Sequence, residues 1–270
     1  MTSENAGGDA SDEPPVRYVR EGRVGHVILN RPARLNAFTD AMLVAFHDAL
    51  VELDEDDDVW VGVISGEGRA FCSGADVGER QMRPAHELGR FGGTGGWRSY
   101  LPDYFFRLTH WKPLIAATHG YVFGMGLRVA VLCEFVVAAE GTVFEVTETH
   151  RGLDATPLWA HLRARGGSGF ATDVALTGRR WTAEEGHRAG VIDRLAPAGE
   201  HLDVAGRLAL DLAAGPPLSV RAIVEARRGE LEELELGRRL TRPRGLHLSE
   251  DFQEALRARA EKRPPTFRGR

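Results

Sequence analysis

The sequence predicts an α/β fold, with a mostly parallel sheet covered by helices and a helical region at its C-terminal end. Three observations predict it. Nearly continuous apolar runs, such as 59–65 and 134–139, have the composition of buried parallel strands. Strand, turn and helix patterns recur up to about residue 195, which is the order of βαβ units. After about residue 198 the patterns are helical.

The composition limits the classes of protein to which the chain can belong. Its 270 residues are 43% hydrophobic, which is enough for one large domain or a domain with an appendage. A net charge of −5 without a dense basic block argues against a nucleic-acid or anionic membrane surface. Cys72 and Cys133 are the only cysteines and lack metal-type spacing, so we expect neither a disulfide framework nor a metal site.

No targeting or membrane segment is expected. The longest uncharged stretch, 113–127, contains Thr118 and His119, and it is too short and too polar to span a bilayer. The first residues lack the basic and then apolar pattern of a signal peptide. The sequence therefore predicts a cytoplasmic protein.

The N-terminal residues divide into a tail and the start of the core. Residues 1–15 contain almost no bulky apolar side chains, so we expect a disordered tail. The α/β core is then expected over 16–197. It begins with a hairpin over 16–30, in which a strand, a glycine-containing turn and a second strand follow one another. Arg31-Pro32 ends the second strand.

A helix and a buried strand follow the hairpin. Thr39 is a suitable N-cap for a helix that runs to about Asp56. The apolar residues on one face of this helix are Leu43, Phe46, Leu50 and Leu53. The run 59–65 is then a short strand, bounded by acidic residues before it and glycines after it. An apolar strand after a helix indicates a βαβ unit with a covered sheet.

The central stretch, 114–133, combines a strand, a glycine-rich turn and a helix. We expect the strand over Leu114–Thr118 and the helix over Gly126–Cys133. The N–H groups at the start of such a helix are free, and the helix dipole favours negative charge there. A dinucleotide-binding fingerprint is a weak alternative, because Val129 stands at its third glycine position. Glycines that only permit tight packing are another alternative.

The segment 78–97 is polar and rich in glycine. Its F-G-G-T-G-G-W sequence, 91–97, resembles a phosphate-binding loop, but it lacks the G-K-[ST] ending and a strand before it. We therefore expect a mobile loop here.

The C-terminal part is expected to be helical. Before it, Thr182 and Glu185 form a capping box, and Gly190 is a helix stop. The region 198–270 is predicted to contain helices over 200–213, 216–228, 231–240 and 249–262. The apolar stripe of the last helix consists of Phe252, Ala255, Leu256 and Ala260. This stripe is expected to belong to the core or to pack on a neighbouring subunit.

Two glycine-containing turns indicate chemistry. The turns 73–75 (Ser-Gly-Ala) and 124–126 (Gly-Met-Gly) each follow a predicted strand. If the turns converge, two backbone N–H groups can point at one oxygen atom, which is the geometry of an oxyanion hole.

Five segments that contain these turns occur together and in order. They are NRPARLNA (30–37), GEGRAFCSGAD (66–76), HGYVFGMG (119–126), LTGRRWTAEEGHRAGVID (176–193) and KRPPTFRG (262–269). This set resembles the enoyl-CoA hydratase/isomerase (crotonase) family over essentially residues 16–270. The resemblance implies a crotonase-type core of ββα turns wound in a spiral, and a C-terminal helical trimerisation region over 198–270. It also implies coenzyme A thioester substrates and no permanently bound cofactor.

The resemblance also assigns site residues. The backbone N–H groups of Ala75 and Met125 are expected to hold the thioester oxygen, which becomes an enolate-like anion during reaction. The residues expected to cradle coenzyme A are Arg34, Leu35, Ala37, Ala75, Asp76, Val77 and Gly78. Phe267 is expected to lie by the adenine of a neighbouring site.

Arg128 departs from the family's pattern. Hydratases of the family use two glutamates, and the two positions hold Arg128 and Glu148 here. A guanidinium cannot accept a proton, so we do not expect hydration by the usual pair. A single glutamate resembles the family's isomerases, in which one carboxylate removes an α-proton and returns it at the γ-carbon. Glu145 is a competitor for this role, but it is expected to face the opposite side of an extended segment.

Arg128 itself needs an acidic partner if it is buried. The two candidates are Glu148 and an acidic group of the substrate. We favour the substrate and count Arg128 among the catalytic candidates, because an ion pair with Glu148 weakens the only expected base.

The residues after Glu148 also differ from the family. His150, Arg151 and Asp154 are expected to have solvated or packing roles. The family's glycine-rich loop is replaced by D-A-T-P-L-W-A (154–160), and Trp159 with Pro157 is expected to shorten the acyl site.

The sequence thus predicts an acyl-CoA enzyme that stabilises a thioester enolate and uses Glu148 as its acid and base. We expect a homotrimer or a dimer of trimers, with no nucleic acid or membrane as partner. One alternative is a crotonase-fold binding protein with an altered catalytic site. The other is a biosynthetic relative that acts on a non-CoA or carrier-bound substrate.

Overall fold

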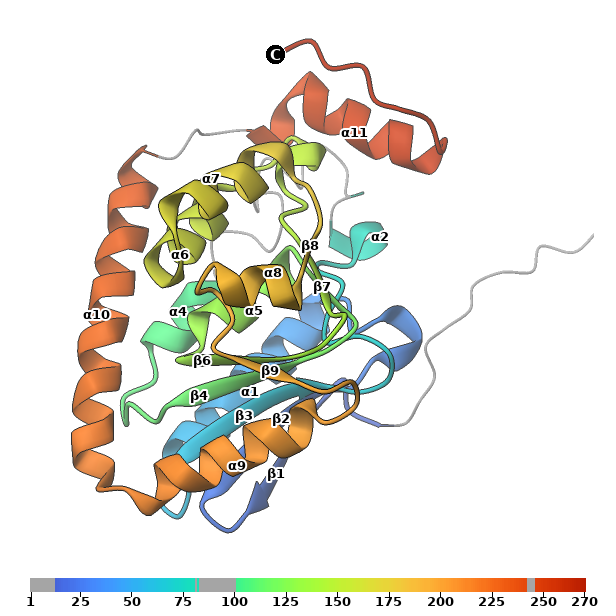
Figure 1. The fold of residues 1–270 in the computed structure, drawn as a ribbon. Coiled ribbons are helices and arrows are strands. Elements are labelled where there is room, and N and C mark those ends of the chain that lie inside the picture. Colours follow the sequence, from blue (N-terminus) through green and yellow to red (C-terminus); the bar gives the residue numbers. More distant parts are fainter. Residues whose placement is uncertain (1–12, 81, 83–100, 242–245) are drawn as a thin grey trace, which may run out of the picture.

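The computed structural model describes residues 13–80, 82, 101–241 and 246–270. The predicted tail, 1–15, lies almost entirely outside the described residues, and so does most of the predicted loop 78–97. Figure 1 shows a twisted sheet with helices on both of its sides, and a long helix, α10 (Pro217–Thr241), along the left side of the view.

Within the described residues, the main sheet has six strands in the order β1-β2-β3-β4-β6-β9. The first two form the predicted antiparallel hairpin, and each later pair of neighbours is parallel. The strands are β1 (Val16–Glu21), β2 (Val24–Leu29), β3 (Val61–Gly66), β4 (Leu114–Thr118), β6 (Phe135–Ala139) and β9 (Arg194–Ala196). A smaller sheet joins β5 (Tyr121–Phe123), β7 (Val143–Glu145) and β8 (Trp181–Thr182). The sequence did not predict β5, which lies inside the glycine-rich stretch.

The helices follow the predicted alternation with strands. Their bounds are Asp40–Glu55 (α1), Val77–Arg80 (α2), Leu101–Phe106 (α4), Met125–Leu132 (α5), Thr156–Arg165 (α6), Ser168–Thr177 (α7), Ala183–Arg188 (α8), His201–Ala214 (α9), Pro217–Thr241 (α10) and Glu250–Ala260 (α11). In the part of the chain that the structure describes, the 3-10 turns are Pro32–Arg34 (η1), Thr149–Arg151 (η2) and Leu246–Leu248 (η3). Among the described residues, no helix is long and apolar enough to cross a membrane.

Two predicted helix starts are confirmed. The Thr39 hydroxyl accepts a hydrogen bond from the Met42 N–H at 3.1 Å, which caps α1. The Thr182 hydroxyl accepts from the Glu185 N–H at 3.3 Å and caps α8. Each cap satisfies an N–H group that has no acceptor inside its own helix.

The main sheet separates two apolar layers. On one face, α9 packs through Ala205, Ala209 and Ala213 against buried residues of the central strands. These small side chains recur every four residues and therefore form one stripe of the helix. On the other face, α1 and α5 contribute to a larger core that also contains the second sheet. Figure 1 shows α9 on the opposite side of the sheet from α5.

Helix α10 is continuous, whereas the sequence predicted two helices over 216–228 and 231–240. The predicted break lies at Gly229, which is helical in the structure. The buried residues of α10 recur at helical spacing on both sides of it: Val224, Arg228, Leu231 and Glu235. One packed face therefore spans the break and outweighs the helix penalty of about 1 kcal/mol for a glycine.

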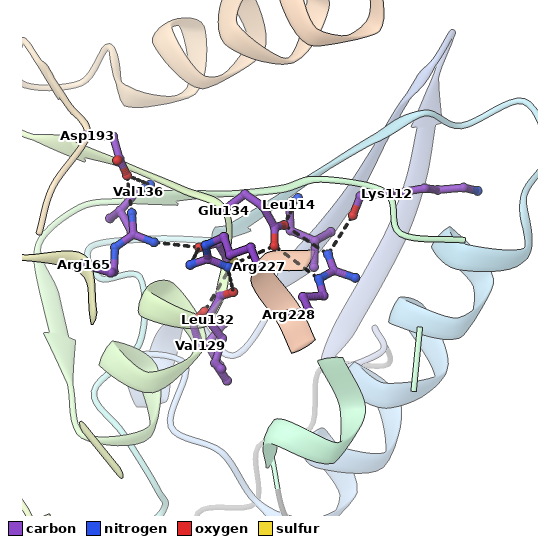
Figure 2. A network of polar contacts seen from close by, with 11 residues as sticks. Lys112, Leu114, Val129, Leu132, Glu134, Val136, Arg165, Asp193, Arg227 and Arg228 are labelled. Atoms are coloured by element: carbon purple, nitrogen blue, oxygen red, sulfur yellow. Dashed lines mark hydrogen bonds and ion pairs between the residues drawn. The ribbon is translucent and has the colours of Figure 1, made fainter. Parts of the chain in front are cut away.

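A polar network fixes α10 and α6 to the end of α5 (Figure 2). The buried Glu134 carboxylate accepts from Arg227 and Arg228, each at 3.1 Å, and from the Leu114 N–H at 2.7 Å. Arg227 and Arg165 both donate to the Cys133 carbonyl oxygen, at 2.9 and 2.8 Å. The buried Arg228 and the half-buried Arg165 and Arg227 thus have acceptors, and Arg165 and Arg227 satisfy carbonyl groups that the end of a helix leaves open.

The last helix, α11, packs on its own chain. Phe252 and Ala255 of the predicted stripe are buried, and α11 lies against η2. Ala260, which the sequence placed on the same face, is exposed, and Ala258 is buried in its place. The part of the stripe that is covered therefore serves the fold of one chain.

Candidate active site

The two predicted turns lie against one another. Cys72, which precedes the first turn, pairs with Val122 of β5 as an isolated parallel bridge. Gly126 is so close that a Cβ atom on it would lie 2.6 Å from the Cys72 carbonyl oxygen. A Cβ atom on Gly74 would lie 3.8 Å from the Met125 nitrogen. Strand pairing through the unpredicted β5 thus brings the turns together.

Two glycines allow the backbone shape of these turns. Gly74 has φ +106° and Gly124 has φ +49°, in the left-handed region that other residues rarely adopt. A Cβ atom on Gly124 would also lie 2.6 Å from the Thr147 hydroxyl oxygen. The glycines are therefore required for backbone conformation as well as for close packing.

The N–H groups of Ala75 and Met125 have no acceptor among the described residues. Ala75 pairs with Phe38 in an isolated β-bridge. The hydrogen bonds of this bridge involve the neighbours of Ala75: the Phe38 N–H donates to the Gly74 carbonyl oxygen and the Asp76 N–H donates to the Phe38 carbonyl oxygen, each at 2.8 Å. Met125 is the first residue of α5, where an N–H group has no intrahelical partner. Two open donors in adjoining turns are suited to bind one ligand oxygen.

The Glu148 carboxylate lies beside these turns. β7 ends at Glu145, and the chain then turns into η2. A Cβ atom on Gly124 would lie 3.2 Å from a Glu148 carboxylate oxygen. Gly124 directly precedes Met125, so this carboxylate lies near the Met125 N–H. Burial raises the pKa of Glu148, and the charges of Arg151 and Arg128 oppose that rise. Glu148 therefore combines the position and the raised proton affinity of a general acid and base.

A cavity of about 410 Å³ adjoins the first turn. Its lining includes all seven residues predicted to cradle coenzyme A: Arg34, Leu35, Ala37, Ala75, Asp76, Val77 and Gly78. The lining residues that the sequence did not assign to the cradle are Ser73, Phe123, Glu145, Thr147, Arg151, Arg180 and Arg259. Segments far apart in the sequence therefore form one cationic cavity.

Asn36 fixes the first of these segments. It is buried, and its amide nitrogen donates to the carbonyl oxygens of Glu67 and Ala70 at 2.9 and 2.8 Å. Its amide oxygen accepts from the Arg31 N–H at 2.8 Å. Leu35 and Asn36 both have positive φ, and these bonds hold that uncommon conformation. The sequence motif contains Asn36, but only the fold shows that it positions the loop.

Glu145 lines the cavity and Glu148 is not among its lining residues, so the expectation that the two carboxylates face different sides stays a prediction. β7 ends at Glu145, so the extended segment that this expectation assumed does not continue to Glu148. Glu145 accepts a hydrogen bond from Arg180 at 2.9 Å. Arg180 also lies over the Phe123 ring, 5.3 Å from its centroid. Arg151, for which we expected a solvated or packing role, lines the same cavity.

Arg128 has a partner that the sequence did not indicate. Its guanidinium donates to the Glu235 carboxylate of α10 at 2.6 Å. The same carboxylate lies 3.2 Å from Nε2 of the buried His161. The sequence proposed Glu148 or a substrate as partner, because the long-range packing of α10 on α6 is not visible in a local pattern. Arg128 is not one of the residues that line the cavity.

Other residues singled out in the sequence lie away from the cavity lining. His150 packs against Gly178, and the Asp154 carboxylate accepts from the Thr156 N–H at 3.0 Å. Trp159 donates from its ring N–H to Thr172 at 3.1 Å. Phe267 lies in the C-terminal segment and is 47% exposed. Its predicted contact with a neighbouring site stays a prediction.

An α/β fold that places two open N–H groups beside a buried carboxyl group defines a class of protein able to stabilise a carbonyl-derived anion. The family model described as enoyl-CoA hydratase/isomerase matches residues 20–270, and the chain belongs to this family. It is therefore an acyl-CoA-processing enzyme, and the predicted crotonase-type fold is confirmed.

Individual relatives agree with this assignment. The chain is 33% identical to the 2,3-dehydroadipyl-CoA hydratase of Escherichia coli (strain K12), over 93% of this chain and 97% of the relative. It is 32% identical to a probable mitochondrial enoyl-CoA hydratase of Dictyostelium discoideum, over 92% of this chain and 88% of the relative. Its structure is similar to that of carnitinyl-CoA hydratase from Mycobacterium avium, with a TM-score of 0.77, 29% identity and coverage of 96% and 100%.

Proposed function

We propose that the enzyme moves a double bond within an enoyl-CoA thioester, with Glu148 as its single acid and base. The observation that carries this proposal is the Glu148 carboxylate beside Gly124, next to the open N–H of Met125. The position of the family's first glutamate holds Arg128, which is engaged with Glu235. One carboxylate suffices for a proton shuttle, whereas hydration by the family's usual pair needs two.

The reaction proceeds in two proton transfers. The Glu148 carboxylate removes a proton from C2 of a 3-enoyl-CoA, and the C–H electron pair forms a C1–C2 double bond. The carbonyl π electrons move to the thioester oxygen, which becomes an enolate held by the N–H groups of Ala75 and Met125. As the enolate collapses, C4 takes the proton from Glu148, and the product is a 2-enoyl-CoA. Glu148 returns to its ionised form.

The electrostatics of the site support this role. A raised pKa makes the ionised Glu148 a stronger base, and it allows the carboxyl group to keep the proton between the two transfers. Arg34, which lines the cavity within the predicted coenzyme A cradle, fits a phosphate of coenzyme A, which favours a coenzyme A thioester over a neutral diketone.

Reversible hydration is a second candidate. Glu145 lines the same cavity as the coenzyme A cradle, and relatives are named hydratases and dehydratases. In this mechanism Glu145 would leave Arg180 and hold a water molecule together with Glu148. Its ion pair with Arg180 at 2.9 Å opposes that role.

The experiment offers the purified protein 3-hexenoyl-CoA and 2-hexenoyl-CoA separately, and follows products by mass spectrometry. Isomerisation converts the first into the second without a change in mass, and in deuterated water it introduces deuterium at C2 or C4. Hydration instead adds the mass of one water to 2-hexenoyl-CoA. Hydration as the faster reaction would contradict the proposal and assign the second candidate.

We also propose that the chain assembles as a homotrimer or a dimer of trimers. Several large apolar side chains on α9 and α10 are exposed in one chain: Leu202, Leu210, Leu218, Ile223 and Leu236. Exposed apolar surface of this kind favours burial against another subunit. Sedimentation at micromolar concentration tests this, and a monomer would contradict it.

A further inference from the structure

Arg151 is a cavity arginine whose charge has no acidic partner among the described residues. Its backbone N–H donates to the Glu148 carbonyl oxygen at 3.0 Å, which fixes the residue in η2. Arg151 is half-buried and lines the cavity, and its guanidinium makes no hydrogen bond or ion pair with any described residue. Arg180, on the same cavity, binds the Glu145 carboxylate. A partly buried guanidinium without a carboxylate is costly unless a ligand supplies the anion.

A second cation reinforces the first. Arg259 of α11 lines the same cavity as Arg151. Burial, and then the like charge of Arg259, lower the pKa of Arg151, while Glu148 and Glu145 act in the opposite direction. The packing of α11 on η2, where Phe252 lies against Gly152, keeps the two cations on one cavity. Packing thus holds like charges together, and a bound anion would relieve their repulsion.

The position of Arg151 distinguishes the two ends of a coenzyme A thioester. The reacting carbons must lie beside Glu148, and Arg151 is three residues after it in the same turn of backbone. Among the side-chain charges, that of Arg151 has the largest effect on the pKa of the Glu148 carboxyl group, which it lowers. The phosphates of coenzyme A are separated from these carbons by the pantetheine arm. An anion at Arg151 is therefore most simply a group of the acyl chain.

The geometry points to an acyl group that itself carries a carboxylate, bound by the Arg151 guanidinium with Arg259 beside it. Two parallel N–H groups of a guanidinium match the two oxygens of a carboxylate. Two adjacent cations disfavour an acyl group with a quaternary ammonium, such as a carnitinyl group. The substrate class is then an enoyl-CoA derived from a dicarboxylic acid. This inference rests on the proposed function, because Glu148 marks the reacting end.

Binding of saturated ligands tests the inference without any turnover. Adipyl-CoA and hexanoyl-CoA have acyl chains of equal carbon number and differ in a terminal carboxylate, and neither can isomerise. Calorimetric titration of the wild-type protein should show adipyl-CoA binding about 10–100-fold more tightly, which is the range for a charge-assisted hydrogen-bonded pair. The Arg151→Gln variant should bind both ligands with similar affinity, and Arg151→Lys should retain part of the preference.

Arg34→Gln is the matched control, because Arg34 lines the cavity within the predicted coenzyme A cradle. It should weaken both ligands by the same factor and leave their ratio unchanged. Unaltered hexanoyl-CoA binding by Arg151→Gln would show that this variant is folded. Arg259→Gln should reduce the preference for adipyl-CoA less than Arg151→Gln does.

Two results would overturn the inference. One is equal affinity of the wild-type protein for adipyl-CoA and hexanoyl-CoA. The other is an equal loss for both ligands in Arg151→Gln, which would place a coenzyme A phosphate at Arg151. Failure of the proposed isomerisation is a separate result, because it appears in the turnover of 3-hexenoyl-CoA and leaves the binding ratio of the saturated pair unchanged.

Discussion

The two ends of helix α5 differ in how the protein treats their polar groups. At the C-terminal end, the carbonyl oxygens of Leu132 and Cys133 accept hydrogen bonds from Arg227, and Cys133 also accepts from Arg165. At the N-terminal end, the Met125 N–H has no acceptor among the described residues. Both ends of any helix carry unsatisfied groups, so the difference lies in what the surrounding chain supplies.

The same contrast divides the arginines. Arg227 and Arg228 surround the Glu134 carboxylate and hold α10 in place, as Figure 2 shows. Arg151 lines the cavity without an acidic partner among the described residues. A matched cation stabilises the fold, whereas an unmatched one beside a cavity indicates a ligand. The distinction lies in the acceptors, since the side chains are chemically identical.

The largest expected effect is on catalysis, at the N-terminal end of α5 with its open N–H group. Glu148→Gln keeps the shape of the side chain but removes the base, so kcat should fall by about 10³–10⁴-fold. Affinity for hexanoyl-CoA should change little. Glu145→Gln is the control, and its kcat should stay within about tenfold of the wild type if Glu148 acts alone. Equal losses in both variants would point to a carboxylate pair and to hydration.

At the C-terminal end of α5, where the carbonyl oxygens are satisfied, the expected effect is on stability. Glu134→Ala leaves the buried Arg228 and the half-buried Arg227 without their carboxylate, so the free energy of unfolding should fall by about 3–5 kcal/mol. Urea denaturation measures this change. The kcat per folded molecule should stay near that of the wild type. A large fall in kcat would show that the two ends of α5 are coupled and would break the comparison.

A substitution of Gly124 tests the backbone conformation at the N-terminal end of α5. Gly124→Ala introduces a Cβ atom 2.6 Å from the Thr147 hydroxyl and requires a left-handed φ, so the turn must shift. Loss of one oxyanion donor lowers kcat by roughly 10²–10³-fold. Met125→Ala keeps its N–H and should have a milder effect. Steady-state kinetics on 3-hexenoyl-CoA compare the two, and a larger loss in Met125→Ala would assign the effect to its side chain.

Substitution of Arg128 tests whether this residue stabilises the fold or binds the substrate. Its ion pair with Glu235 predicts that Arg128→Ala lowers the free energy of unfolding, by about 3 kcal/mol for a broken buried pair. Adding Glu235→Ala should then cost less than it does in the wild-type background, because the two residues interact. The ratio of affinities for adipyl-CoA and hexanoyl-CoA should stay unchanged. A changed ratio would return Arg128 to the substrate site.

The smallest expected effect is a pH-dependent gain in the stability of the Glu148→Gln variant. The folded protein holds the Glu148 proton more tightly than the unfolded chain does, because burial raises its pKa above the ordinary value of 4.5. Folding stability therefore falls as pH rises from about that value through the raised pKa, and it is constant above. Glu148→Gln removes this loss, so its Tm relative to the wild type should rise more at pH 8 than at pH 4. Equal differences at both pH values would contradict the raised pKa.

The sequence by itself determined the elements with strong local signals. The hairpin over 16–30, the strand at 114–118 and the cap at Thr39 follow from alternation, apolar runs and side-chain chemistry within a few residues of each other. The five ordered segments likewise indicated the family, and with it the seven cradle residues that line the cavity. Each of these signals is contained in a short stretch of chain.

Tertiary packing decided the rest. The break predicted near Gly229 is absent because one packed face crosses it, and the extended segment expected to reach Glu148 ends at Glu145. The partner of Arg128 lies 107 residues away on α10, beyond any local pattern. Whether an arginine stabilises the fold or faces a ligand depends on acceptors from distant segments, and only the folded chain brings those together.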